Sequence, residues 1–314
     1  MADRSDNSAG GPTQASELAV RESPFPDEGI HRSEATSVRL LPGQQLLTTG
    51  WDGYWRTWNR ENGQLLQEHR AGFEEVDLLA VAPGESLAVF GVQRRLEVID
   101  LATGSALEGF APRSTSSPTH AAAFHPDGDL LLTGTQDKKI HVWDLSSGTR
   151  IETLDGHRRA VSAIGFFGAG PLVASSAMDG EVRTWNLSEG RCRSHRWLMR
   201  SPITAMCLLD DDSAFAVGNS QGDICIWNAG AYKERAQFSA HVGSIHDICA
   251  LGSQHICTVA GDGELRVWRA RDEELVAWHD AGVALHACAW DGRTIYVTGD
   301  DGRLTELAWP NEDV

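Results

Sequence analysis

Residues 133–157 read TGTQDKKIHVWDLSSGTRIETLDGH, and this stretch decides the fold class of the chain. Asp137 precedes Trp143 by six residues, and apolar and polar residues alternate between them. Such alternation is typical of a half-buried strand. A second short segment follows and ends at Gly156-His157. The stretch therefore predicts two short strands joined by a turn.

The step of six residues from a turn acid to Trp recurs along the chain. It is complete at Asp52/Trp58, Asp137/Trp143, Asp179/Trp185 and Asp262/Trp268, Gln221/Trp227 keeps the Trp, and Gln93/Ile99 and Asp301/Leu307 are weaker copies. The steps between successive markers are 41, 44, 42, 42, 41 and 39 residues. This period matches one four-stranded propeller blade. We therefore predict an all-β fold, a seven-bladed β-propeller of four-stranded antiparallel blades.

The constant period also sets the expected domain organisation. No break in the repeat separates one core from another, so residues 23–309 should form one propeller domain. Residues 1–22 carry no apolar period and predict a disordered N-terminal tail, and residues 310–314 a C-terminal tail. The last unit ends after its third strand at Trp309, so we expect an N-terminal strand, from the segment Ser23–His31, to close the ring.

Composition limits the classes of partner. The formal net charge is −17, and the only lysines are Lys138, Lys139 and Lys233, so binding to nucleic acid is not expected. No apolar run is long enough for a membrane helix, and the N-terminus lacks a signal-sequence pattern, so we expect a cytoplasmic protein that does not bind membranes.

The cysteines and acidic runs give no sign of a metal site. The six cysteines show no CxxC or zinc-finger spacing, and Cys207, Cys249 and Cys288 occupy roughly equivalent places in the first strands of three successive units. We interpret them as reduced, small buried hydrophobes. The run Asp210-Asp211-Asp212 favours a solvated turn over a calcium loop. No metal and no cofactor are expected.

A set of polar residues recurs at the blade period. The members are His31, Thr48, Asp52 and Trp58; Thr133, Asp137 and Trp143; His157, Ser175, Asp179 and Trp185; and His241, Thr258, Asp262 and Trp268. Such residue types could form a hydrolytic triad. A catalytic set is needed only once, however, so a set that recurs in several blades favours a structural hydrogen-bond network. The network hypothesis predicts that Asp179→Ala lowers thermal stability.

These motifs resemble the WD-repeat family of propellers, the family of the G-protein β subunit. The resemblance rests on Gly156-His157, the turn acid, and Trp143-Asp144 with its variants such as Trp58-Asn59, and it covers about residues 23–309. It implies a seven-bladed ring that acts as a platform for protein partners and has no catalysis of its own. At the marker Trp of each unit, a full Trp-Asp pair occurs only at Trp143-Asp144, a full Gly-His pair occurs only at Gly156-His157, and the second unit has lost both markers.

The expected binding surface is the channel-mouth face, which we define by the turns that hold the seven markers and by the loops that lead into each first strand. The residues before the markers are Trp51, Val92, Gln136, Met178, Ser220, Gly261 and Asp300, and lead-in residues such as Phe73, His120, Arg158, Arg159, Arg200 and Val242 join them. Exposed aromatic and arginine residues are enriched at binding hot spots.

The sequence suggests a ligand class for this face and leaves alternatives open. We hypothesise that Arg158, Arg159 and Arg200 pair with an acidic or phosphorylated peptide, and that Trp51, Phe73 and Met178 hold its apolar side chains. The alternative is a set of solvated arginines and an incidental aromatic. An alternative function is a propeller enzyme or small-ligand binder that uses the central channel, with His120 and Asp300 as its weak candidates.

Overall fold

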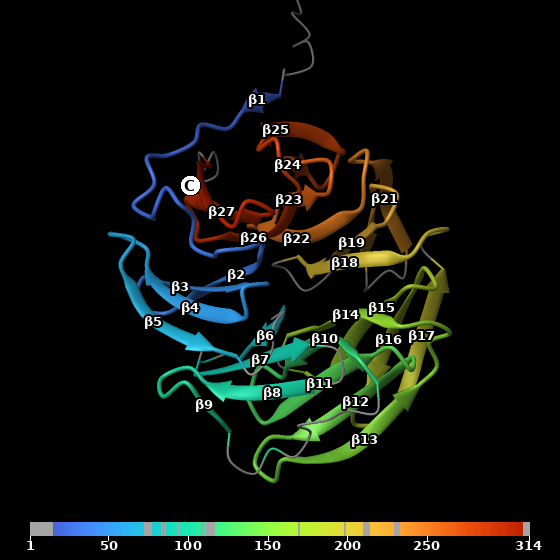
Figure 1. The fold of residues 1–314 in the computed structure, drawn as a ribbon. Helices are drawn as coiled ribbons and strands as arrows, with labels where there is room; N and C mark the ends of the chain where they lie inside the picture. The colour runs from blue at the N-terminus through green and yellow to red at the C-terminus, as the bar shows by residue number, and fades with distance from the viewer. Residues whose placement is uncertain are drawn as a thin grey trace, which may run out of the picture.

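A computed structural model gives the arrangement of the chain. It describes residues 15–309, except for residues 72–76, 83, 85, 93–94, 108–109, 111–116, 169, 198, 210–213 and 229–232. The described residues form strands and turns without a helix, and the strands are arranged as a ring of seven blades (Figure 1). The predicted fold class is confirmed. Asp210-Asp211-Asp212, Phe73 and the C-terminal tail 310–314 lie outside the described residues.

Each of the first six blades is an antiparallel meander. Blade one holds β2 (Ala35–Leu41), β3 (Gln45–Gly50), β4 (Tyr54–Asn59) and β5 (Leu65–Arg70), and blade two holds β6 (Asp77–Val81), β7 (Leu87–Val92), β8 (Arg95–Asp100) and β9 (Ser105–Ala106). Blade three holds β10 (Thr119–Phe124), β11 (Leu130–Thr135), β12 (Lys139–Asp144) and β13 (Thr149–Asp155), and blade four holds β14 (Val161–Phe166), β15 (Leu172–Ala177), β16 (Glu181–Asn186) and β17 (Arg191–Trp197). Blade five holds β18 (Ile203–Leu208), β19 (Ala214–Asn219), β20 (Asp223–Asn228) and β21 (Lys233–Ser239), and blade six holds β22 (Ile245–Leu251), β23 (His255–Ala260), β24 (Glu264–Arg269) and β25 (Glu274–Asp280).

The N-terminal segment closes the ring. Blade seven has three named strands, β26 (Leu285–Trp290), β27 (Thr294–Gly299) and β28 (Leu304–Ala308). The N-terminal segment lies along β28, because Val20 forms an antiparallel bridge with Leu307, Ala308 N–H donates to Ala19 O at 3.0 Å, and Arg21 N–H to Glu306 O at 2.9 Å. Just before it, β1 (Ser16–Glu17) pairs in parallel with β25 of blade six.

The closing segment lies earlier in the chain than the sequence predicted. The predicted tail ended at residue 22, yet residues 16–21 are paired with blades six and seven, and Leu18 is buried. The predicted closing segment, Ser23–His31, instead covers the junction of blades seven and one, where Phe25 meets Trp58 edge to face. The prolines in that segment explain the difference, since proline cannot donate to a strand ladder.

The core consists of apolar layers between neighbouring blades. Apolar side chains that alternate along the third strands face the next blade, because successive side chains of a strand point to opposite faces. Trp55 of β4 stacks on Phe90 of β7, with ring centroids 5.7 Å apart, and Ile140 and Val142 of β12 pack in one cluster with Phe166 of β14. This packing fixes the angle between blades and therefore the ring that carries the channel-mouth face.

Candidate functional site

A recurring backbone hydrogen bond builds the channel-mouth face. In six blades the residue before the marker donates its N–H to a carbonyl of the lead-in loop of the same blade. These bonds are Trp51 to Glu34 at 3.0 Å, Gln136 to Pro118 at 2.8 Å, Met178 to Ala160 at 2.9 Å, Ser220 to Pro202 at 3.0 Å, Gly261 to Ser244 at 3.0 Å and Asp300 to Ala284 at 3.0 Å. The main chain at these positions is therefore occupied, and the side chains are left to project from the face.

A glycine after the marker allows this close approach. Gly180 and Gly222 have φ of +79° and +88°, a region that favours glycine. A Cβ atom at Gly222 would lie 2.1 Å from the carbonyl oxygen of His241, and one at Gly180 would lie 2.2 Å from that of Met199. Any larger residue would push the turn away from the loop that leads into the next blade.

The recurring polar set of blade six forms a continuous hydrogen-bonded chain. His241 Nδ1 lies 3.1 Å from both carboxylate oxygens of Asp262, and its Nε2 lies 2.8 Å from Thr258 Oγ1. Trp268 Nε1–H donates to the same hydroxyl oxygen at 3.2 Å. A carboxylate only accepts, so Nδ1 carries the proton, and Nε2 accepts from the threonine hydroxyl.

The protonation states in this chain are set by burial and by the partners. Burial lowers the pKa of His241 against the opposing pull of Asp262, so the imidazole is neutral in the folded protein. Burial acts to raise the pKa of Asp262, but the backbone N–H of Val242 and the neighbouring His241 outweigh it, and the pKa is lowered. The set is thus a neutral imidazole held by an ionised carboxylate.

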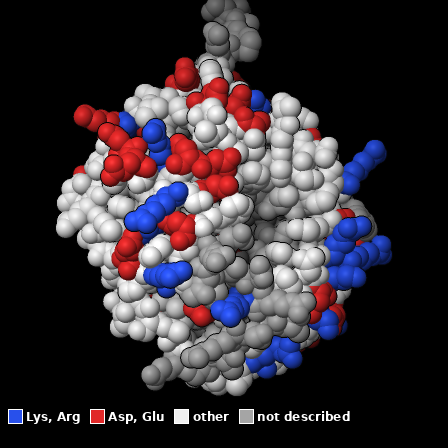
Figure 2. Space-filling view, viewed as in Figure 1, with Lys and Arg blue, Asp and Glu red and all other residues white. Residues whose placement is uncertain are grey.

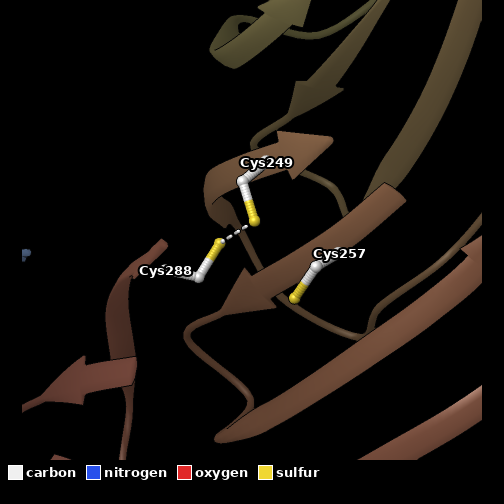
Figure 3. Close-up of side chains that lie close together, drawn as sticks. All are labelled: Cys249, Cys257 and Cys288. Atoms are coloured by element: carbon white, nitrogen blue, oxygen red, sulfur yellow. Dashed lines mark hydrogen bonds between the residues drawn. The ribbon is translucent and has the colours of Figure 1, made fainter. Parts of the chain in front are cut away.

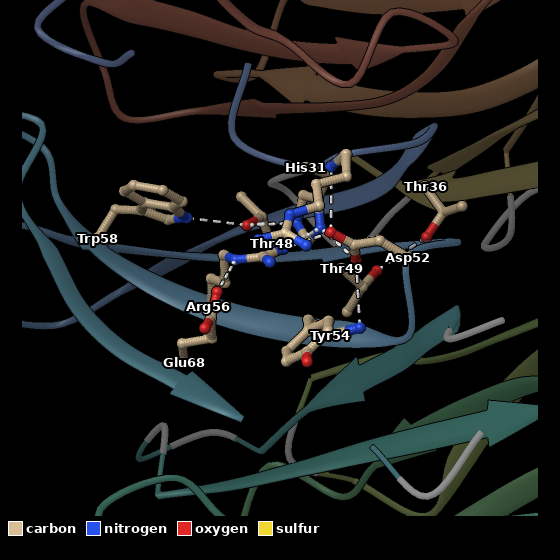
Figure 4. Close-up of polar contacts among 10 residues, drawn as sticks. His31, Thr36, Thr48, Thr49, Asp52, Tyr54, Arg56, Trp58 and Glu68 are labelled. Atoms are coloured by element: carbon tan, nitrogen blue, oxygen red, sulfur yellow. Dashed lines mark hydrogen bonds and ion pairs between the residues drawn. The ribbon is translucent and has the colours of Figure 1, made fainter. Parts of the chain in front are cut away.

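Blade one carries the same set with an additional arginine (Figure 4). His31 Nδ1 lies 2.9 Å from Asp52 Oδ1 and its Nε2 3.0 Å from Thr48 Oγ1, which also accepts from Trp58 Nε1 at 3.0 Å. Arg56 donates to Asp52 Oδ2 at 2.8 Å. Burial opposes ionisation of Asp52, but His31, the Arg32 N–H and Arg56 overcome it and hold the pKa of Asp52 well below its usual range.

Sequence reasoning missed this arginine, although it recurs four residues after the marker. Arg56 bridges Asp52 and Glu68, Arg183 pairs with Glu181 at 2.7 Å, and Arg266 donates to Glu264 at 2.6 Å. The signal was present in the sequence as Arg at positions 56, 183 and 266, each four residues after a turn Asp. Each arginine supplies a positive charge beside the carboxylates of its own blade.

Blade four departs from this geometry. His157 Nε2 lies 2.7 Å from Ser175 Oγ, which accepts from Trp185 Nε1 at 2.8 Å, but His157 Nδ1 is 3.8 Å from Asp179 Oδ2, beyond hydrogen-bond length. Burial acts against ionisation of Asp179, yet nearby His157 and the backbone N–H groups of Arg158 and Glu181 lower its pKa to about 2. Here the carboxylate chiefly holds the backbone of the turn.

Blade three has no histidine in its set. Trp143 Nε1 donates to Thr133 Oγ1 at 3.0 Å, as in the other blades. The turn acid Asp137 instead accepts from the hydroxyl of Thr135, and its own N–H donates to Ser117 Oγ at 2.9 Å. The indole-to-hydroxyl bond is therefore common to blades one, three, four and six, while the partner of the turn acid varies.

The burial and hydrogen bonding of the hydroxyl groups in these sets do not fit a hydrolytic triad. The hydroxyls of Thr48, Ser175 and Thr258 belong to residues with 0% exposure, and each oxygen already accepts an indole N–H. A nucleophile must reach a substrate carbonyl beside an oxyanion hole. These side chains have a structural role.

The predicted partner-binding residues are brought together only in part. Arg158, Arg159 and Arg200 are exposed. They flank Met178, because Met178 N–H bonds Ala160 O and Met199 N–H bonds Gly180 O at 3.3 Å. Trp51 is exposed at 43% but belongs to blade one, three blades away.

The two ionisable residues that the sequence suggested for the central channel, His120 and Asp300, each have a hydrogen-bond partner. A cavity of about 350 Å³ is lined by first-strand residues of all seven blades. His120 lies 2.7 Å from Gln136 Oε1, and Asp300 lies 2.6 Å from His286 Nε2, so both predicted candidates already have partners.

A larger cavity lies where blades seven and one meet, away from the predicted site. It measures about 920 Å³ and is lined by charged residues, among them Arg21, Arg60, Asp291 and Glu306. Arg60 donates to Asp291 Oδ2 at 2.7 Å. Glu306 is buried, its Oε1 has no partner among the described residues, and burial raises its pKa.

Comparisons with known proteins agree with the repeat. A family model described as "WD domain, G-beta repeat" matches residues 112–144 and 148–186. Pre-mRNA-processing factor 19 of Bos taurus is 30% identical over 138 residues, which are 43% of this chain and 27% of that protein. Target of rapamycin complex subunit wat1 of Schizosaccharomyces pombe is 23% identical over 248 residues, 75% of this chain and 78% of that protein. Probable serine/threonine-protein kinase PkwA of Thermomonospora curvata is 48% identical over 50 residues, 16% of this chain and 7% of that protein.

The alignment with the first of these relatives spans only about a quarter of its length, so the likeness concerns its repeats. Within the described part of this chain, no helix is long and apolar enough to cross a membrane. The chain therefore carries WD repeats: the family model matches two of them, and the repeat period and the seven blades agree with a WD-repeat β-propeller.

Proposed function

We propose that the chain is a non-enzymatic scaffold that binds protein or peptide partners on the channel-mouth face. The observation that carries this proposal is a group of exposed apolar side chains at positions that the fold does not use. Trp51, Met178 and Val242 are exposed at 43%, 38% and 90%. Tryptophan is enriched at the hot spots of protein interfaces, so the exposed Trp51 supports this face as an interaction surface.

The relatives support a role in protein assemblies. The relative that aligns over 78% of its length is, by its name, a subunit of the target of rapamycin complex, and another is named as a pre-mRNA-processing factor. Assembly with other proteins is therefore the function that we carry over as a proposal. The partner itself does not follow from these names.

The charges around Met178 favour a partner with acidic or phosphorylated groups. Arg158, Arg159 and Arg200 are exposed on two neighbouring lead-in loops, on a chain whose net charge is −17. The Arg158 side chain is 70% exposed and lies 4.0 Å from Glu181, at the limit of an ion pair. Arginine binds carboxylate and phosphate groups with two parallel hydrogen bonds, so this cluster suits such a ligand.

A charge-reversal experiment tests this site. The double variant Arg159→Glu/Arg200→Glu should lose the partners that the wild-type chain retains in an affinity purification analysed by mass spectrometry. The matched control is Arg191→Glu/Arg193→Glu, which makes the same charge change on the outer strand β17 of blade four, where both residues are exposed. Retention of the same partners by the Arg159→Glu/Arg200→Glu variant would exclude the cluster as their binding site.

We also propose that the chain acts in the cytosol, on the ground of the reduced cysteines that the sequence predicts. Fractionation of cells that express the chain from its own gene would test this, and recovery with a membrane or secreted fraction would contradict it.

A further inference from the structure

Three cysteine side chains converge between blades six and seven (Figure 3). Cys249 of β22 and Cys288 of β26 point toward one another with their sulfur atoms 3.4 Å apart, and Cys257 of β23 completes the group. All three sulfur atoms lie within 4.8 Å of one another. Cys257 and Cys288 have exposures of 0% and 2%. Three soft donor atoms thus meet in the apolar layer between two blades.

The strand registers explain why these thiols meet. Cys249 lies directly opposite Cys257 in the β22–β23 pair, so both side chains stand on the same face of blade six. Cys288 lies opposite Val297, and in blade six the corresponding pair is Ile248 and Thr258. Cys288 is therefore one residue out of step with Cys249, and a shift of one residue turns its side chain to the other face, back toward blade six.

The neighbouring interface shows that packing does not require three thiols. In blade five, Cys207 takes the place of Cys249, and Ala216 takes the place of Cys257. Ile248 of blade six occupies the place of Cys288 at that interface. One thiol and two apolar residues fill the layer there, in the same fold and with the same strand pairing. Packing between two blades therefore does not explain why three thiols meet between blades six and seven.

Two charged groups lie beside the trio and act on its thiols in opposite directions, because Arg39 lowers the pKa of Cys249 and Asp247 raises it. Asp247 accepts from the Cys288 N–H at 3.2 Å and pairs with Arg39 at 3.3 Å, which places a guanidinium near the sulfur atoms. Hydrogen bonds from Cys257 and Cys288 lower the pKa of Cys249, against the effect of burial. The pKa of Cys257 is raised, chiefly by burial.

We propose that Cys249, Cys257 and Cys288 form a binding site for one Cu(I) ion held by three sulfur atoms. Soft thiolate ligands select Cu(I), Zn²⁺ or iron–sulfur clusters. A structural zinc site requires four ligands, and among the described residues the metal-ligating group contains only these three. Cu(I) is satisfied by three thiolates, and its binding releases to solvent the protons of the thiols that are still protonated.

The site would connect two blades near the point where the ring closes. Cys249 and Cys257 belong to blade six, whereas Cys288 belongs to blade seven. An ion bound by all three residues stabilises only the state in which the two blades are docked. Cu(I) should therefore raise the thermal stability of the whole ring.

Cu(I) loading of the full-length chain tests the proposal. The reduced protein is titrated without oxygen with Cu(I) held by bicinchoninic acid, and the bound metal and the melting temperature are measured. The wild-type chain should retain one Cu(I) per molecule and melt at a higher temperature. Cys257→Ala, which copies the residue of blade five, should retain none and show no rise.

The matched control is Cys207→Ala, which removes a cysteine from the corresponding place in blade five. It should bind Cu(I) as the wild-type chain does. Circular dichroism before loading selects variants that are folded, and Cys288→Val replaces Cys257→Ala if the latter does not fold. Equal Cu(I) binding by Cys257→Ala and the wild-type chain would overturn the proposal. So would stoichiometric binding of Zn²⁺ without Cu(I), or a Cys249–Cys288 disulfide in place of bound metal.

Discussion

At the scale of single residues, the recurring polar set shows how one arrangement is used with different partners. His31 and His241 each join a turn Asp to a buried Thr, whereas His157 makes only the bond to its hydroxyl. Asp52 is also bonded by Arg56, whose side chain is only 7% exposed. The same residue types should therefore contribute different amounts to stability in different blades.

Removal of the turn carboxylate should cost more in blade one than in blade four. Asp52→Ala removes the buried carboxylate that Arg56 and His31 share and leaves them only Glu68 and Thr48 as partners. Loss of one member of a buried ion pair costs about 3–5 kcal/mol. Asp179→Ala removes acceptors of two backbone N–H groups and should cost about 1–3 kcal/mol. Urea unfolding of both variants measures the difference. Equal losses would mean that Arg56 is satisfied without Asp52.

Stability should fall as the pH decreases from 7.5 to 5.5. The pKa values of His31, His141, His241 and His279 are lowered in the folded chain, mainly by burial. The unfolded chain then binds more protons below its histidine pKa of about 6.5. Stability is complete above that pH and decreases below it, by at most about 1.4 kcal/mol per pH unit for each histidine. His241→Gln should flatten this dependence relative to the wild-type chain, and an unchanged slope would contradict the assignment.

Glu306 should destabilise blade seven at neutral pH. Its position is the fifth after the marker, where the other blades have Thr57, Val98, Val142, Thr184, Ile226 and Val267. Burial raises its pKa, so protonation favours the folded state, and stability is lost as the pH rises above the unfolded value of about 4.3. Glu306→Gln should raise the melting temperature at pH 7.5 by roughly 2–4 °C, the change expected for about 1 kcal/mol. At pH 4 the gain should shrink, and a loss of stability at pH 7.5 would show that the charge is compensated.

At the scale of elements, the closing segment joins the two ends of the ring. β1 adds to blade six, and residues 19–21 serve as the outer strand of blade seven. A chain closed in this way has no exposed edge on its last blade, which would otherwise invite pairing with another chain. The backbone hydrogen bonds Leu18 N–H to Trp278 O, Arg21 N–H to Glu306 O and Ala308 N–H to Ala19 O hold this segment. The side chain of Leu18, with 5% exposure, adds apolar burial.

Two truncations measure how much this segment contributes to the stability of the ring. Removal of residues 1–21 deletes β1, Leu18 and the bonds to β28, and burial of one leucine side chain alone is worth about 1.5–3 kcal/mol. The truncated chain should melt at a lower temperature and should aggregate on heating. Removal of residues 1–14 leaves every described contact in place and should have no such effect. Equal melting temperatures for the two truncations would show that the ring does not need this closure.

The elements that the sequence predicted well are those fixed by local periodicity. The Asp-to-Trp step and the alternation in strands such as β12 determined the blades and the layers between them. The closing segment was misplaced because residues 16–21 have no apolar period and pair only with strands about 260 to 290 residues away. The meeting of Cys249 with Cys288 depends on a register offset of one residue between two blades, which spacing alone does not reveal.

At the scale of the whole molecule, the residues that stabilise the blades are buried, whereas the residues proposed to bind partners are exposed on one face. Polar signature residues such as Thr48 and Ser175 are buried inside the blades, while Trp51, Met178 and Val242 project from the channel-mouth face. The charges are also uneven: acidic side chains gather around the upper and left parts of the face seen in Figure 2, and the centre of the ring is hollowed. Such a molecule offers partners a surface whose side chains can vary without loss of the fold.

The most direct test of the scaffold proposal is site-specific photo-crosslinking in cells that express the chain. A photo-reactive amino acid is placed at Val242, which is 90% exposed on the channel-mouth face, or at Ile151, which is 58% exposed on the outer strand β13. The scaffold proposal predicts that position 242 captures a defined set of proteins and that position 151 does not. Equal capture at both positions, or capture at position 151 alone, would contradict it.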